Sequence, residues 1–105
     1  MAFEVVLAPE AAQVLRKLPG HLRAWVKEAI ERHLRHAPTK VSKSRIKRLR
    51  GLSQPQYRLR VGDMRVFYDV TETAVEVLAV VTKAQAQAWL KEKGTAAPGG
   101  GVGSG

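Results

Sequence analysis

Residues 57–68, with the sequence YRLRVGDMRVFY, contain the pattern on which the expected fold depends. Apolar or aromatic residues alternate there with Arg58 and Arg60, so the two arginines share one face of a strand and the apolar side chains share the other. Gly62-Asp63 is a tight-turn pair, and residues 64–70 return as a strand rich in Val, Phe and Tyr. The stretch therefore predicts a β-hairpin with one cationic face.

The segments around this hairpin predict an α+β domain with the element order βααβββα. Residues 3–7 alternate as a short first strand, and two amphipathic helices follow, separated by Pro19-Gly20 and ended by Pro38. Residues 75–81 are apolar on both faces, as in a central strand, and residues 83–93 have helical composition.

The two tryptophans are predicted to be packing residues. Trp25 lies on the apolar stripe of the second helix and is expected in the core. Trp89 has apolar neighbours in the last helix and is expected to dock that helix, with stacking on a nucleic-acid base as the alternative.

A chain of 105 residues holds one domain, which we expect to span residues 1–93. Residues 94–105 contain six glycines, and Val102 is the one residue there large enough to anchor them, so a flexible tail is expected.

The composition argues against several classes of site. The chain has no cysteine, and His21, His33 and His36 have no acidic cluster nearby, so neither a metal nor another cofactor is expected. No apolar run approaches the ~18 residues of a membrane span, and the first residues lack the sections of a secretory signal. We therefore expect a cytoplasmic protein without membrane contact.

The net charge of +9 is concentrated in one part of the sequence. Residues 40–65 contain one acid, Asp63, and nine basic residues, so they carry eight of the nine net positive charges. The nine are Lys40, Lys43, Arg45, Lys47, Arg48, Arg50, Arg58, Arg60 and Arg65. Such a patch indicates a polyanion-binding surface, while a solvated face that keeps the protein soluble is the plain alternative.

The run 57–68, preceded by KRLRG at 47–51 and by Leu18-Pro19, resembles the central signature of the RelE/ParE toxin superfamily. The resemblance extends from Ala2 to about Lys93. It implies a twisted, mostly antiparallel four-stranded sheet, with a helical hairpin on one face and a cationic concave surface on the other. It also implies a toxin of a type II toxin-antitoxin module, silenced by an acidic antitoxin protein.

The resemblance assigns roles to particular residues. In RelE-like members that cut messenger RNA on the ribosome, basic residues on two neighbouring strands grip the scissile phosphate, and Arg58, Arg60 and Arg65 match those positions. Lys83 aligns with a further cation that is more often arginine, and Trp89 stands where many members have a tyrosine. The residues expected to hold the nucleic-acid backbone are Lys43, Arg45, Lys47, Arg48 and Arg50.

These departures leave the chemistry open. Cleavage through the 2′-hydroxyl needs charge stabilisation and proton transfer at both ends. Arginine supplies the first but is a poor base, so Lys83 is the one suitable base in the set, and Trp89 has no titratable proton. The leading hypothesis is a metal-independent, ribosome-dependent mRNA endonuclease. The alternatives are a ParE-like inhibitor of DNA gyrase and a catalytically inactive module that binds RNA or a partner.

Overall fold

The computed structural model describes residues 2–98, so the part of the expected tail from 99 to 105, with Val102, lies outside the described residues. The chain has the predicted α+β class. Its elements are β1 (Glu4–Leu7), α1 (Pro9–Lys17), α2 (Gly20–Ala29), the π-helical turn η1 (Ile30–Leu34), β2 (Ile46–Arg48), β3 (Leu52–Gln54), β4 (Tyr57–Val61), β5 (Met64–Val70), β6 (Ala74–Thr82), α3 (Lys83–Lys93) and β7 (Thr95–Ala96). No helix among the described residues is long and apolar enough to span a membrane.

The main sheet has five strands in the order β1-β6-β5-β4-β2, one more than expected. β1 is parallel to β6, and the other neighbours are antiparallel. The additional strand, β2, lies in the basic stretch before residue 57, for which the sequence predicted no strand. Its buried Ile46 pairs with Leu59 of β4, and this single apolar anchor within a run of cations gave too weak a pattern to predict a strand.

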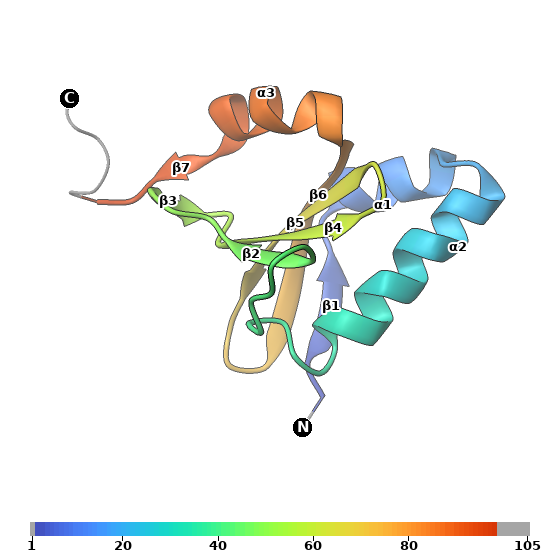
Figure 1. Cartoon of the computed structure of the whole chain (residues 1–105), viewed down its shortest axis with the longest axis horizontal. Helices are drawn as coiled ribbons and strands as arrows, with labels where there is room; N and C mark the ends of the chain where they lie inside the picture. The colour runs from blue at the N-terminus through green and yellow to red at the C-terminus, as the bar shows by residue number, and fades with distance from the viewer. Residues whose placement is uncertain (1, 99–105) are drawn as a thin grey trace.

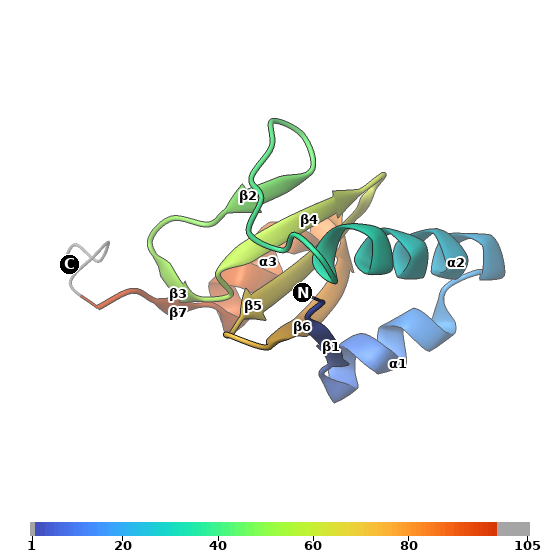
Figure 2. The same ribbon diagram turned by 90° about the horizontal axis from the view of Figure 1, so that it is seen from below.

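The helices lie on both faces of the sheet, as Figures 1 and 2 show. The core lies between the α1–α2 pair and one sheet face, where Leu15 and Val26 pack with Leu59, Val66 and other buried side chains. α3 packs on the opposite face of β5 and β6, where the ring of Trp89 stacks on Phe67. The predicted helical hairpin is therefore confirmed, and α3 covers part of the other sheet face.

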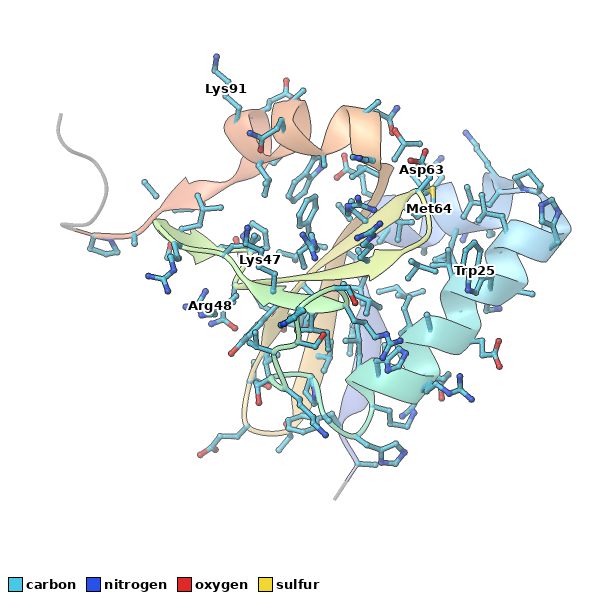
Figure 3. All side chains as sticks on the ribbon, viewed as in Figure 1. Trp25, Lys47, Arg48, Asp63, Met64 and Lys91 are labelled. Carbon is cyan, nitrogen blue, oxygen red and sulfur yellow. The ribbon has the colours of Figure 1, made fainter. Side chains whose placement is uncertain are left out.

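The prediction that Trp25 belongs to the core was wrong, since 50% of its surface is exposed. Val26, the next residue of α2, is fully buried and occupies the core position instead. Trp25 projects toward the β4–β5 turn, near Asp63 and Met64, beyond the edge of the core (Figure 3).

The segment after α3 is more regular than expected. Thr95 and Ala96 form β7, which pairs antiparallel with β3, and the amide of Ala97 donates to the carbonyl oxygen of Gly51 at 3.0 Å. Regular structure therefore continues past Lys93 into the segment from Gly94 that was expected to belong to the tail. Short polar segments at 52–54 and 94–97 carry little periodicity, so their pairing was not visible in the sequence.

Candidate nucleic-acid interface

Strand register brings three of the predicted site residues together. Arg60 pairs directly with Arg65 across β4 and β5, and Arg58 pairs with Phe67 one step along the same face. Directly opposed side chains project to the same side of a sheet, so all three arginines project from the face opposite the α1–α2 core. We call Arg58, Arg60 and Arg65 the arginine cluster.

Arg58 is the member of this cluster furthest from the β4–β5 turn and is only partly exposed. Its Nε is buried and has no hydrogen-bond partner among the described residues. Burial lowers the pKa of Arg58, and the neighbouring charges of Arg65 and Arg60 lower it further. A partly desolvated cation with an unused donor and two like charges beside it is stabilised by any anion that reaches it.

The other two arginines have different surroundings. Arg65 is 8% exposed, and its Nη1 donates to the carbonyl oxygens of Gly62 at 2.9 Å and Met64 at 3.0 Å. Arg65 thus holds the β4–β5 turn while adding its charge to the face. Arg60 is exposed and free to approach a ligand from solvent.

No carboxylate neutralises the cluster within the part of the chain that is described. The one ion pair found there joins Arg35 to Glu31 on η1, with 2.6 Å between Nη2 and Oε2. Residues 2–98 also hold no group of three or more His, Asp or Glu side chains arranged for a metal. The cluster is therefore suited to bind an external anion.

Lys83 lies at the end of the cluster closest to the β4–β5 turn. It is the first residue of α3, two positions after Val81, which pairs with Arg65. Its backbone amide donates to the carbonyl oxygen of Asp63 at 2.8 Å, and its side chain is exposed. The position at this end of the cluster follows from the fold, whereas a contact with substrate stays a prediction.

The predicted backbone-binding residues divide between the two sheet faces. Lys47 pairs with Arg58 and extends the cationic face onto β2. Arg48 pairs with Tyr57 on the opposite face, where its guanidinium lies 5.2 Å from the centre of that ring. Nη1 of Arg48 donates to Leu49 O and Gln56 O, so this residue does not join the cluster.

A cleft of about 680 Å³ separates β2 and the following loop from α3. Lys47 and Arg50 line one wall, and Lys91 lines the other. Sequence reasoning missed Lys91, because only the docking of α3 over the sheet face brings its last turn to the cleft. The side chain of Lys91 itself extends from α3 away from β2 (Figure 3). The remaining members of the predicted set, Lys43 and Arg45, are exposed beside β2.

The aromatic residues of the domain provide no titratable group on the cationic face. The ring of Trp89 stacks on Phe67 with 5.2 Å between centroids and 9° between planes, so it docks α3 on the sheet. Tyr68 is fully buried on the helix face, stacks on Tyr57 and donates from its hydroxyl to Pro38 O at 2.7 Å. Burial raises the pKa of Tyr68 well above the usual tyrosine value.

Comparison with known proteins places this geometry in a family. The family model described as ParE toxin of type II toxin-antitoxin system, parDE, matches residues 5–87. The chain belongs to this toxin family, within the RelE/ParE superfamily. A search of curated proteins gave no match.

Solved structures with the same fold are RelE-type toxins. The toxin-antitoxin complex RelBE2 of Mycobacterium tuberculosis matches with 27% identity and a TM-score of 0.59, over 78% of this chain and 99% of that one. The RelB-RelE complex of Methanococcus jannaschii has 24% identity and a TM-score of 0.62, over 80% and 96% of the two chains. A mutant of Escherichia coli RelE in the free state has 19% identity and a TM-score of 0.54, over 89% and 99%. At 24% and 19% identity, the Methanococcus jannaschii and Escherichia coli structures show only that the fold is shared.

Proposed function

We propose that the arginine cluster binds the phosphodiester backbone of messenger RNA on the ribosome and that this toxin cleaves the message there. Arg58 is the observation that supports the proposal most directly. Its unused Nε, its partial burial and its two cationic neighbours favour an anion with several oxygens, such as a phosphate.

The proposed chemistry is mainly electrostatic. Arg58 and Arg60 stabilise the charge that accumulates on the phosphate as the 2′-oxygen attacks and the 5′-oxygen leaves. Arg65 acts through its hydrogen bonds to the β4–β5 turn, which hold the two strands in register, and adds a third positive charge. Lys83 is the candidate base for the 2′-hydroxyl, and solvent supplies the proton of the leaving oxygen.

Inhibition of DNA gyrase is the second candidate function. Two observations favour it: the match to the ParE toxin model, and the position of both tyrosines of the described chain, Tyr57 and Tyr68, on the sheet face opposite the arginine cluster. In that case the same cations bind without cutting. A catalytically inactive module that binds RNA or a partner is the third candidate.

An acidic antitoxin is the proposed partner. The Mycobacterium tuberculosis relative was solved as a toxin-antitoxin complex. Here the arginine cluster and the cleft below α3 form a cationic surface that an acidic, partly disordered segment can cover by folding on it. Production of the toxin alone is expected to arrest growth in cells, and coproduction with the antitoxin is expected to restore it.

The test compares two reactions with the same proteins. A programmed translation reaction read by primer extension is run beside a gyrase supercoiling reaction, for wild type, Arg58→Ala, Lys83→Ala and the control Lys27→Ala. Lys27 is an exposed lysine of α2 on the side away from the cluster. Breaks in the message that fall ~10²–10³-fold in rate in the first two variants and persist in the control support cleavage. An intact message with blocked supercoiling favours the gyrase inhibitor, and silence in both reactions favours the inactive module.

A further inference from the structure

A second hollow, which we call the α2 groove, lies between α2 with η1 and the β4–β5 turn. It has a volume of about 460 Å³. Its walls include Trp25, Arg32, His33, Arg45, Arg60 and Gly62. Arg60 belongs to both the arginine cluster and this groove, so the two sites are continuous.

The ring of Trp25 is held in place on one side and open on the other. A Cβ added to Gly62 would lie 2.4 Å from Cη2 and 2.7 Å from Cζ3 of Trp25, so the six-membered ring packs directly on this turn residue. Half of the Trp25 surface nevertheless remains exposed. A large aromatic ring fixed against a glycine and open to solvent is well suited to stack on a flat ligand.

The charges around Trp25 favour an anionic ligand. Arg32, Arg45 and Arg60 face the groove, and Glu28 is the one carboxylate on its walls. Burial lowers the pKa of His33, with smaller effects from Arg45 and Arg32, which favours the neutral imidazole in the groove. A neutral imidazole can accept a hydrogen bond that the surrounding guanidinium groups cannot.

We propose that the α2 groove binds one nucleotide of single-stranded RNA beside the phosphate held by the arginine cluster. The base stacks on Trp25, and the phosphate that follows it lies between Arg45 and Arg60. This inference rests on the proposed function, since it requires RNA at the cluster. An acidic peptide matches the charges equally well, but the rigid, half-exposed ring favours the planar base of a nucleotide.

Intrinsic fluorescence gives a direct test, because the chain has two tryptophans. Trp89→Phe keeps an aromatic ring on Phe67 and leaves Trp25 as the one indole fluorophore. Titration of this protein with a single-stranded RNA hexanucleotide is expected to quench the fluorescence of Trp25. A dye-labelled form of the same RNA reports affinity by anisotropy in the variants without Trp25.

The variants separate the groove from the cluster. Trp25→Ala is expected to weaken RNA binding about tenfold, because it removes the ring on which the base stacks, and Trp25→Phe only slightly, because it keeps an aromatic ring there. Arg45→Ala is expected to weaken binding several-fold and to reduce its salt dependence by about one counterion. Lys27→Ala, on the other side of α2, is the matched control and should leave affinity unchanged. Circular dichroism verifies that each variant is folded.

Three outcomes would overturn the inference. The first is that RNA does not quench the fluorescence of Trp25 and that folded Trp25→Ala binds RNA with full affinity. The groove then does not bind RNA, while the proposed function stands if Arg58→Ala still stops cleavage of the message. Quenching by a hexaglutamate peptide and not by RNA makes the groove a peptide-docking surface. If no RNA binds and Arg58→Ala leaves cleavage of the message unchanged, the groove and the proposed function both fail.

Discussion

Replacement of Arg58 by methionine is expected to stabilise the fold while it removes the function. The change keeps an unbranched side chain of similar length and removes a buried Nε without a partner, together with repulsion from Arg60 and Arg65. An unsatisfied buried donor costs ~1–3 kcal/mol, and because solvent screens this partly exposed group we take the lower end, about 1 kcal/mol. For a domain of this size that corresponds to a rise in Tm of about 4–8 °C.

Replacement by methionine is expected to change the Tm differently for each arginine of the cluster, so the three variants together test the reasoning. Arg60→Met changes an exposed side chain and should leave Tm nearly unchanged. Arg65→Met loses the hydrogen bonds to Gly62 O and Met64 O and should lower stability by about 2 kcal/mol. Thermal unfolding by circular dichroism at low salt measures all three. A lower Tm for Arg58→Met than for wild type would refute the reasoning that, without a bound anion, the unpartnered Nε of Arg58 and the repulsion from its neighbours destabilise the fold.

Three further predictions concern the packing around the site. Trp89→Ala should lower stability by ~3 kcal/mol in thermal unfolding, because α3 loses its stack on Phe67; an unchanged melting curve would show that the ring does not dock the helix. Burial raises the pKa of Tyr68 in the folded protein above the value of ~10 that it has in the unfolded chain. The neutral hydroxyl therefore contributes its full share of the folding free energy below pH ~10, and this share is lost as the pH rises further. Tyr68→Phe should lose ~1–3 kcal/mol at pH 7 with its hydrogen bond to Pro38 O, yet show a smaller decline than wild type between pH 10 and 12; equal alkaline declines would contradict the assignment. Gly62→Ala places a Cβ at a φ of 58° and should cost at least ~1 kcal/mol in urea unfolding, whereas wild-type stability would mean that the turn relaxes freely.

The sequence predicted most of the sheet, because alternation over 57–70 and the apolar run at 75–81 are strong period-two signals. It also predicted that Arg58 and Arg60 share a face, and the family resemblance grouped Arg65 with them; the register of the β4–β5 hairpin places Arg65 directly opposite Arg60. It did not predict the division of Lys47 and Arg48 between two faces. That division depends on β2 being a strand, and β2 forms through pairing with β4 rather than through a local pattern of its own.

Residues that depend on distant contacts were also the ones misplaced. Trp25 fits an apolar helical stripe, but the stripe is wider than the area that the sheet can cover, so the residue at its margin is left outside the core. Lys91 carries no signal in the sequence that distinguishes it from any other lysine in the last turn of a helix. Its relation to the cleft appears only once Trp89 has fixed α3 over Phe67.

The pairing of β7 with β3 joins the end of the described chain to its middle. α3 is consequently tethered twice, at Thr82 through the capping box with Gln85 and beyond Lys93 through β7. The backbone from β3 to β7 therefore forms a closed loop, in which α3 lies on one side of the cleft and the β3–β7 pair closes its end. A bulky domain fused directly after Lys93 would remove the pairing of β7 with β3 and release the C-terminal end of α3. A tag for this protein is therefore better placed at the N-terminus or beyond Pro98.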